Sequence, residues 1–409
     1  MLDINFIRQN PEKVKEACEK KQVKVDVDKL LDLDKEVRKY KTEEQELRAM
    51  QNKLGQDKID EGKKLKEQIK AVKKLLSEGL EDELNSLLQT IPNIPFDDVP
   101  VGKSDADNVV LRKVGKIPNF KFNPRSYLEI GERLDIIDVE RASKVAGSRF
   151  GYLKGQAALM EFALVNLAFD LLIKKGFVPV VPPVMIKREM ALGTGFAQAV
   201  DNKEAYYLPD DDLYLIGTSE QSIAAMHSEE VLSEKDLPKR YVGFSTCFRR
   251  EAGSYGKDIK GILRVHQFDK VEMFSFCKPE DSIKEHKLIL SLEEELMKAL
   301  KLPYQIVNIC TGDLGLPAVA KYDIETWIPL ENKYRETHST SNCTDFQARR
   351  LKIKYKDKEN NLKFVHTVNG TAFAVGRIII AIIENYQQEN GSIKVPAVLQ
   401  KYMGVKIIK

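Results

Sequence analysis

Residues 247–272 contain the run CFRREAGSYGKDIKG (Cys247–Gly261), then RVHQF (Arg264–Phe268) and Glu272. Apolar segments on both sides of a glycine-rich loop predict two antiparallel strands joined by that loop, because glycine permits sharp turns. Such a hairpin can hold a nucleotide. Arg249 can face a phosphate, Glu251 can accept from an adenine amino group, and Phe268 can stack on a purine. Each residue alone has an ordinary alternative as a solvated or core side chain, but their combined spacing favours a nucleotide site.

Length and composition limit the class of protein. The 409 residues exceed the usual size of one domain and predict two. The net charge of +3 is too small for the whole surface to attract polyanions, so any nucleic-acid binding needs a local patch. The five cysteines are odd in number and never spaced as Cys-x-x-Cys, which argues against a disulfide framework and against structural zinc. We expect a cytoplasmic protein without a membrane span, since neither a leader nor a run of about twenty apolar residues is present.

Residues 27–91 form a charged region with two apolar stripes. Alternating steps of three and four residues predict two helices that pair as an antiparallel coiled coil. The stripes are Leu30, Leu33, Val37, Tyr40, Leu47 and Leu54, then Leu65, Ile69, Val72, Leu76, Leu80, Leu84, Leu87 and Ile91. One extra residue between Leu76 and Leu80 predicts a local change of winding. At about 1.5 Å per residue, the hairpin would be roughly 45 Å long.

The second predicted helix of this hairpin begins with a cluster of lysines. Its members are Lys63, Lys64, Lys66, Lys70, Lys73 and Lys74. They can form a phosphate-binding face or a merely solvated surface, and charge alone leaves both interpretations open.

Closely spaced prolines after residue 91 end the hairpin, and we expect an N-terminal domain over residues 1–100 and a second domain over 101–409. Gln156–Lys175 predicts a helix, followed by an edge strand that contains Pro179. Further strand signals recur at 205–216, 241–251, 262–276 and 304–309. They lack a regular β-α-β alternation and therefore predict an α+β fold, an antiparallel sheet flanked by helices. The P-loop and Rossmann glycine patterns are both missing.

Three longer motifs resemble those of class II aminoacyl-tRNA synthetases. The hairpin is similar to motif 2, the helix and strand through Pro182 to motif 1, and Asn369–Ile380 (NGTAFAVGRIII) to motif 3. The runs GTSE (Gly217–Glu220), VHQF (Val265–Phe268) and SNCTDFQARR (Ser341–Arg350) narrow the resemblance to the bacterial-type seryl-tRNA synthetase family, along the whole chain.

That resemblance implies a serine–tRNA ligase reaction. L-serine and ATP form seryl-adenylate with Mg²⁺, and the seryl group passes to the 3′-terminal adenosine of tRNA(Ser). Whether tRNA(Sec) is also a substrate is left open. The family also implies a homodimer built across motif 1 and a coiled-coil arm that grips the tRNA, which would give the lysine cluster its purpose.

The resemblance also assigns residue roles. Arg249 and Arg377 are the catalytic candidates. The expected ATP contacts are Arg249, Arg250, Glu251, Val265, Phe268, Glu336, Thr337, His338, Ser339 and Arg377. The expected serine contacts are Thr218, Ser219, Glu220, Arg249, Glu272, Asn369 and Thr371. Glu336 and Ser339 would hold the metal, and Glu272 with Thr371 would read the serine hydroxyl. His338 stands where the family usually has a small polar residue, and we expect it to be a loop side chain without a catalytic role.

Three alternatives compete with this interpretation. A synthetase-like ligase that loads a carrier protein would lack the long arm. A non-catalytic RNA-binding or scaffold protein would have lost residues such as Arg249 or Arg377, which are present. A class II enzyme for another amino acid is disfavoured by the Glu272 and Thr371 pair.

Overall fold

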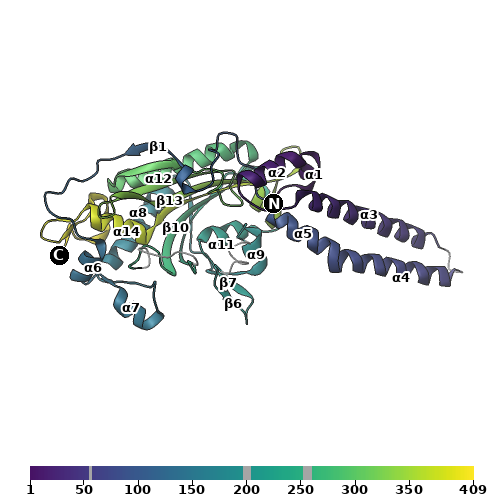
Figure 1. The fold of residues 1–409 in the computed structure, drawn as a ribbon, viewed down its shortest axis with the longest axis horizontal. Helices are drawn as coiled ribbons and strands as arrows, with labels where there is room; N and C mark the ends of the chain where they lie inside the picture. Colours follow the sequence, from purple (N-terminus) through teal and green to yellow (C-terminus); the bar gives the residue numbers. More distant parts are fainter. Residues whose placement is uncertain (55–57, 197–203, 252–259) are drawn as a thin grey trace. The chain divides into compact units, whose positions relative to one another are not determined.

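The computed structural model describes residues 1–54, 58–196, 204–251 and 260–409. It divides into two compact units, Met1–Ile94 and Pro95–Lys409 (Figure 1). Most of the predicted glycine-rich loop, residues 252–259, lies outside the described residues, as do residues 55–57 of the arm.

The N-terminal unit is helical throughout its regular structure. It consists of α1 (Ile4–Gln9), α2 (Pro11–Lys20), α3 (Val27–Asn52), α4 (Ile59–Leu75), a π-helical turn (Leu76–Leu80) and α5 (Glu81–Thr90). The apolar stripes of α3 and of the segment 59–90 meet in one core that includes Leu30, Val37, Leu76 and Leu84. The π turn lies where the spacing of the stripe predicts a change of winding, so that prediction is confirmed.

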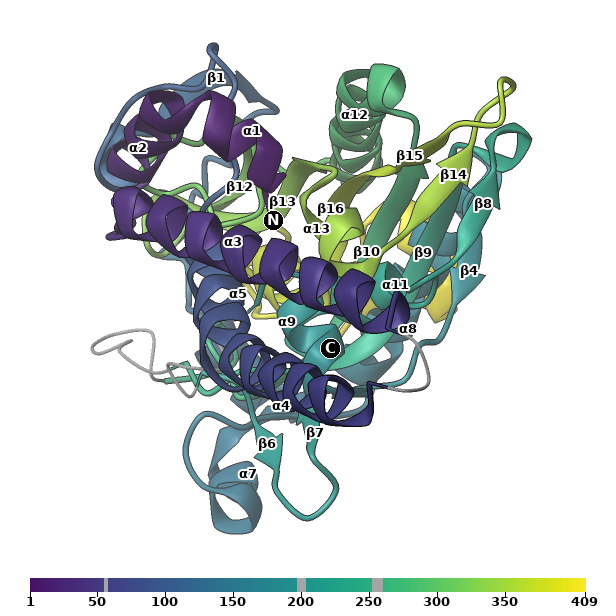
Figure 2. The ribbon, with the colours of Figure 1, turned by 90° about the vertical axis from the view of Figure 1, so that its right-hand side faces the viewer.

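The second unit is built on a sheet of eight strands, and the predicted α+β fold is confirmed. The order of the strands is β1-β11-β12-β13-β16-β10-β9-β4. Their bounds are β1 (Val109–Val114), β4 (Val178–Val180), β9 (Lys239–Phe248), β10 (Gln267–Cys277), β11 (Tyr304–Asn308), β12 (Ala320–Ile328), β13 (Lys333–Thr344) and β16 (His366–Ala374). All neighbours pair antiparallel except β4 and β9 (Figure 2). Pro179 therefore lies in an edge strand, where a missing N–H costs no ladder bond.

Helices pack on the sheet in two groups. The main core joins the sheet to α8 (Gln156–Ile173), α12 (Ser282–Leu300) and α14 (Val375–Asn385). A separate apolar cluster joins β9 and β10 to α11 (Ser219–Ala225) and α13 (Phe346–Leu351). Two glycines allow close approach. A Cβ at Gly243 would lie 2.5 Å from Ile223 of α11, and one at Gly370 would lie 2.3 Å from Ile289 of α12.

The remaining elements are short. Within the described ranges, the other helices are α6 (Tyr127–Arg133), α7 (Val139–Ala146), α9 (Arg188–Gly193) and α15 (Gln400–Met403), with 3-10 turns at 105–107, 234–236, 279–281 and 397–399. The small sheets pair β2 (Ile137–Asp138) with β3 (Tyr152–Leu153), β17 (Ile393–Lys394) with β18 (Ile407–Ile408), β5 (Met185–Lys187) and β6 (Tyr207–Leu208) with β7 (Leu213–Leu215), and β8 (Val231–Ser233) and β15 (Leu362–Phe364) with β14 (Lys354–Lys356). The strand signal at 205–216 is thus a short hairpin, and β10 begins at Gln267 rather than Ile262.

Helix α8 is long and apolar enough, by length and composition, to cross a membrane. It is the one such helix among the described residues, and 44% of it is buried inside the second unit. Its buried side chains, which include Met160 and Leu164, belong to the main core, whereas Leu159 and Phe162 remain exposed.

Candidate active site

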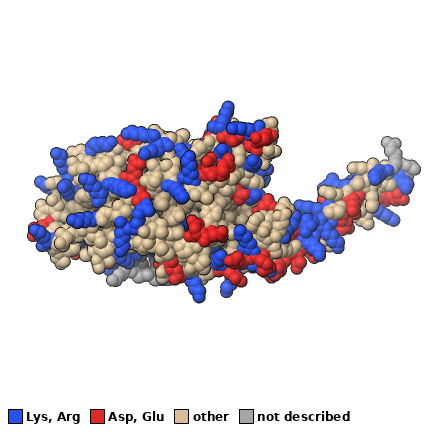
Figure 3. Space-filling view, turned by 90° about the horizontal axis from the view of Figure 1, so that it is seen from above, with Lys and Arg blue, Asp and Glu red and all other residues tan. Residues whose placement is uncertain are grey.

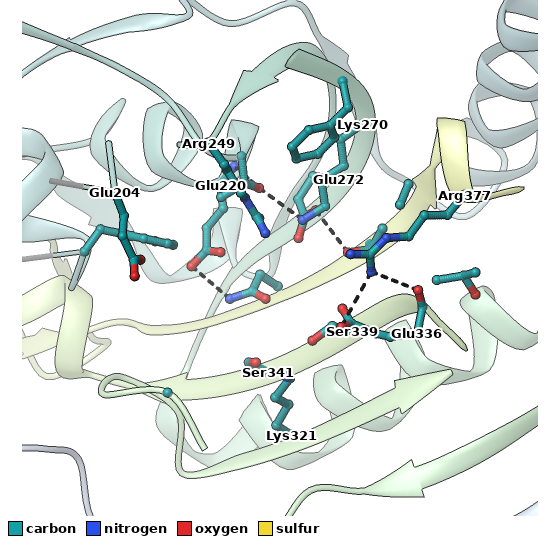
Figure 4. A pocket seen from close by; sticks show the side chains of 18 of the residues that line it. Glu204, Glu220, Arg249, Lys270, Glu272, Lys321, Glu336, Ser339, Ser341 and Arg377 are labelled. Atoms are coloured by element: carbon teal, nitrogen blue, oxygen red, sulfur yellow. Dashed lines mark hydrogen bonds and ion pairs between the residues drawn. The ribbon is translucent and has the colours of Figure 1, made fainter. Parts of the chain in front are cut away.

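A cavity of about 410 Å³ opens over the middle of the large sheet (Figure 4). Strands β12, β13, β16 and β10 supply its floor, and the chain after β9 supplies Arg249. The predicted site residues that line it are Thr218, Glu220, Arg249, Glu251, Val265, Phe268, Glu272, Glu336, Thr337, Ser339, Asn369, Thr371 and Arg377. Segments far apart in the sequence therefore meet in one cavity.

Strand alternation places the polar side chains of β10. Phe268, Lys270 and Glu272 are two residues apart and all line the cavity, as a period of two requires. On the neighbouring strand, Thr371 pairs with Glu272, while Phe373 pairs with Val271. Ala372 is therefore an extra residue, a β-bulge that changes the register between Thr371 and the start of α14.

A second bulge organises β13. Glu336 and Ser339 are three residues apart and would point to opposite faces of a regular strand. Glu336 pairs with Glu325 and His338 pairs with Ile324, so Thr337 has no partner of its own. This bulge brings Glu336 onto the same side as Ser339, and both line the cavity.

One end of the cavity has a buried carboxylate held by amides. Thr218 caps α11 by accepting from the Glu220 N–H at 3.3 Å. The Glu220 side chain accepts from Gln347 Nε2 at 2.8 Å and from Asn369 Nδ2 at 3.0 Å. Burial and the nearby charge of Glu272 raise the pKa of Glu220 to about 7. The arrangement suits a small cationic group of a ligand.

A second buried carboxylate, that of Glu272, lies beside Glu220. Lys270 Nζ lies 2.5 Å from Glu272 Oε2 and also donates to Thr218 Oγ1 at 3.3 Å. Thr371 Oγ1 donates to Glu272 Oε2 at 3.4 Å. Burial raises the pKa of Glu272, and the Lys270 ammonium opposes that effect. A small alcohol placed here would find both a carboxylate and a hydroxyl.

Two guanidinium groups lie along the rest of the cavity. The Arg249 guanidinium lies 5.3 Å from the centroid of the Phe268 ring, and its Nε donates to the Gly217 carbonyl at 3.1 Å. Arg377, in the first turn of α14, donates to the Glu336 carbonyl at 2.9 Å and lies 3.6 Å from its carboxylate. The cavity thus combines an aromatic face with fixed positive charge, which suits a nucleoside phosphate.

Several side-chain oxygens of the kind that bind metal ions lie near Glu336. Enclosure opposes ionisation of Glu336, but the charges of Arg377 and Lys321 prevail and lower its pKa. Asp323 pairs across the strands with Ser339 and hydrogen-bonds to it. Lys321 Nζ lies 3.2 Å from Asp323 Oδ2. Asp323 Oδ1 is buried without a hydrogen-bond partner among the described residues. No group of three or more His, Cys, Asp and Glu residues in the described ranges is placed to hold a metal.

Three predicted contacts do not line the cavity. Arg250 lies 4.7 Å from the Tyr206 ring and donates to the Ala205 carbonyl. Ser219 is buried, with its hydroxyl 3.5 Å from the Gly243 carbonyl. The expectation of a loop position for His338 is wrong, because His338 lies in β13, is 1% exposed and packs edge-on against Phe373. Beside the bulge it faces away from Ser339, and burial lowers its pKa to about 3.

Sequence reasoning missed five polar residues of the cavity: Glu204, Arg264, Lys270, Lys321 and Ser341. Lys270 and Ser341 were within reach of the sequence, because Lys270 lies between Phe268 and Glu272 with period two, and Ser341 follows Ser339 in the same way. Lys321 carried no signal, since its place depends on the pairing of β12 with β13.

Comparisons with known proteins match the whole chain. The family model "tRNA synthetase class II core domain (G, H, P, S and T)" matches residues 206–386, and "Seryl-tRNA synthetase N-terminal domain" matches residues 1–95. The serine–tRNA ligase of Thermodesulfovibrio yellowstonii is 43% identical, with 100% of both chains covered. That of Acidothermus cellulolyticus is 45% identical, over 100% of this chain and 99% of the relative.

Solved structures agree with this relationship. Seryl-tRNA synthetase from Pyrococcus horikoshii, complexed with ATP, superposes with a TM-score of 0.91 at 41% identity, covering 100% of this chain and 99% of that one. The cytoplasmic enzyme from Naegleria fowleri, in complex with AMP, gives 0.88 at 36% identity with the same coverage. Full-length identity of this degree, joined to the geometry of the cavity, shows that the chain belongs to the seryl-tRNA synthetase (serine–tRNA ligase) family of class II aminoacyl-tRNA synthetases.

Proposed function

We propose that this chain activates L-serine with ATP and transfers the seryl group to tRNA(Ser). The observation that carries the proposal is the single cavity in which Glu220, Glu272 and Thr371 lie beside Arg249 and Arg377. Its polar end suits an amino acid with a hydroxyl, and its other end suits a nucleoside triphosphate.

In the first step a serine carboxylate oxygen attacks the α-phosphorus of ATP. A new P–O bond forms, the bond to the β-phosphate oxygen breaks, and pyrophosphate leaves with its electron pair. Arg249 binds the serine carboxylate and the α-phosphate together, so that it aligns the reactants and offsets charge on the phosphate. Fixed alignment of this kind supplies up to about 7–11 kcal/mol in favourable model reactions.

The adenine and the phosphates are bound by the other residues of the cavity. Phe268 and Arg377 stack on the two faces of the purine, each contributing about 1–3 kcal/mol by analogy with base stacking elsewhere. Glu251 accepts from the adenine amino group. Arg377 also reaches the γ-phosphate of a bent ATP.

The donor set near Glu336 fits Mg²⁺. Glu336, Ser339 and the unpartnered oxygen of Asp323 are hard oxygen ligands, and Mg²⁺ commonly takes only one or two carboxylates together with substrate phosphates. When bound there, the ion would neutralise charge on the phosphate chain. Lys321 lies beside Asp323 and keeps that carboxylate in place.

Serine is selected through polar groups that a smaller amino acid would leave unsatisfied. The serine ammonium pairs with Glu220, and the hydroxyl is read by Glu272 and Thr371. In the second step the terminal ribose hydroxyl attacks the seryl carbonyl, AMP leaves, and the adenylate phosphate accepts the proton. None of the five histidines lines the cavity, so none is placed as a general base.

We propose that two copies of the chain form a homodimer across α8 and β4. Several apolar side chains of this surface are exposed in the single chain: Leu159, Phe162 and Ile173 on α8, with Val178 and Val181 at β4. A helix as apolar as α8 gains from further burial. Phe162→Glu should therefore produce a monomer by sedimentation velocity, whereas a dimer of unchanged affinity would contradict this arrangement.

The lysine cluster of the arm is proposed to bind tRNA. All six lysines are exposed, and basic side chains gather along the arm in Figure 3. No acidic group of the described residues lies within ion-pair distance of Lys64, Lys66 or Lys70, whereas Lys73 and Lys74 have acidic neighbours at 3.9 and 3.6 Å. Free ammonium groups release counterions when they meet phosphates.

A triple alanine variant of Lys64, Lys66 and Lys70 tests this role. It should charge tRNA poorly, and the salt slope of its tRNA binding should fall by about one unit for each phosphate contact that is lost. Serine-dependent ATP–pyrophosphate exchange should be unchanged. The matched control removes the same charge from exposed Lys284, Lys287 and Lys298 of α12. Equal loss in both variants would contradict a local contact. Deletion of residues 28–90 should give the same split between the two assays.

One assay tests the whole function. Radiolabelled pyrophosphate exchange is run with each amino acid in turn, followed by charging of tRNA(Ser) and tRNA(Sec). Exchange led by an amino acid other than serine would overturn the specificity, and exchange without charging of tRNA would favour a carrier-protein ligase. The five unpaired, buried cysteines fit the proposed cytoplasmic location.

A further inference from the structure

A second cavity, of about 440 Å³, lies beside the active site. Ile262, Val265, Phe268 and Gly376 line both cavities and form the wall between them. The rest of its lining comes from α7, from residues 150–153, from the first half of α8, and from Gln267 and Asp269 of β10. It shares Val265 and Phe268 with the active site, whereas Glu272 and Arg377 do not line it.

Two carboxyl groups meet in this cavity, Glu161 of α8 and Asp269 of β10. Asp269 points to the side of the sheet opposite to Phe268 and Lys270. Asp269 Oδ1 is buried, and among the described residues no N–H or O–H group donates to it. Its neighbour is the Glu161 carboxyl, with which it hydrogen-bonds. A hydrogen bond between two carboxyl groups needs one of them to carry a proton, so a pair that meets in this cavity is suited to share one.

The mouth of the cavity is apolar and exposed. Val145 is 74%, Phe162 57% and Tyr152 43% exposed. No lysine or arginine of the described residues lines it, and the polar side chains besides the two carboxyls are Tyr152 and Gln267. From α7 the cavity receives only Ala142, Val145 and Ala146, and from α14 only Gly376. Of the residues that the structure describes, Asp269 is the one charged group that acts on Glu161.

This mouth is continuous with the apolar surface of α8. Phe162 belongs both to the rim and to the exposed row with Leu159. In a two-fold dimer the same patch meets itself, so an apolar, nearly neutral rim is self-complementary, whereas two ionised carboxylates facing their symmetry mates are not.

We propose that a second copy of this chain covers the cavity, and that Glu161 and Asp269, sharing one proton, make the dimer weaken in alkaline solution. The inference rests on the homodimer proposed above. It adds which acid groups the interface buries and how the interface responds to pH.

The sign follows from the charges. Burial, together with the hydrogen bond and the negative charge of Asp269, raises the pKa of Glu161 to about 8 in the single chain. Covering the cavity removes more water and raises that pKa further. The stabilisation of the dimer is therefore fully present below pH about 8 and is lost as pH rises through the pKa of the dimer. Two symmetry-related pairs titrate, so the dissociation constant rises by up to about 100-fold per pH unit in that window.

The test is sedimentation velocity of the full chain, at nanomolar to micromolar concentrations, between pH 6.5 and 9.5. The wild type should be dimeric with a constant affinity up to pH 8 and should lose at least about tenfold in affinity by pH 9.5. Glu161→Gln keeps a donor for Asp269 without a titrating proton, so its dimer affinity should be flat over the same range. Asp269→Asn, checked for folding by circular dichroism, removes the partner charge but leaves Glu161 buried, so its loss of dimer affinity should move to lower pH. Glu359→Gln, an exposed acid in the turn after β14, is the matched control and should keep the wild-type slope.

Each outcome decides the matter. A dimer with pH-independent affinity, or a Glu161→Gln variant that keeps the wild-type slope, would overturn the shared-proton interface while leaving the homodimer intact. A chain that is monomeric at every pH would instead overturn the homodimer and this inference with it.

Discussion

Thr371→Val is the sharpest test of how the cavity reads a hydroxyl. The substitution keeps the branched shape and removes one O–H group. Thr371 is 3% exposed, its Oγ1 donates to Glu272 at 3.4 Å, and Glu272 is 1% exposed. The bound serine hydroxyl would lose one partner, and Glu272 would lose one donor. A hydrogen bond to a charged group contributes about 1.5–3 kcal/mol, which corresponds to roughly 10- to 150-fold in kcat/KM for serine.

The assay is ATP–pyrophosphate exchange with serine and with alanine. Alanine has no hydroxyl to satisfy, so its kcat/KM should change less than about threefold and the preference for serine should fall by nearly the full factor. Thr371→Ser restores a hydroxyl and should stay near the wild type. If Thr371→Val retains the wild-type preference for serine while folding normally, Thr371 does not take part in reading the side chain.

Three further predictions follow from the same geometry. The KM for serine should fall by up to tenfold per pH unit as pH rises toward about 7, because Glu220 must ionise to pair with the ammonium, and Glu220→Gln should raise KM and flatten this profile. Arg377→Lys should lower kcat/KM for ATP by about 5- to 150-fold, since an ammonium cannot stack on a purine, with little change in KM for serine. Glu293→Leu should raise the free energy of unfolding in urea by about 1–3 kcal/mol, because both carboxyl oxygens of this fully buried residue lack partners among the described residues. That gain should be larger at pH 8 than at pH 5, since burial raises the pKa of Glu293 and the unfolded side chain is ionised at pH 8.

The sequence predicted most of the fold because local patterns determine it. The heptad stripes located the paired helices and even the π turn at Leu76–Leu80. Motif runs located most of the cavity: Arg249 follows the end of β9, Glu272 lies within β10, and Arg377 lies in the first turn of α14. Non-local register was beyond the same reasoning. His338 was expected in a loop, and only the pairing of β13 with β12 shows that it is buried in a strand.

Lys321 is a second residue whose position depends on strand pairing that the sequence does not predict. Nothing in its neighbourhood distinguishes it from the other lysines, and it reaches the cavity because β12 lies next to β13 in the sheet. Nothing in the sequence indicates that Glu161 and Asp269 meet, because they are 108 positions apart and only the fold places their side chains together.

Two unmatched residues of the central sheet, Thr337 and Ala372, have an evolutionary consequence. Loss of either codon would leave the ladder on both sides able to pair, so the offspring protein would still fold. The flanking side chains would also keep their faces, because Glu336 and Ser339 would then be two residues apart in a regular strand. Such a deletion removes only the local bend and extra twist of a bulge, so it would change the spacing of the groups that line the cavity and leave unchanged which of them face it.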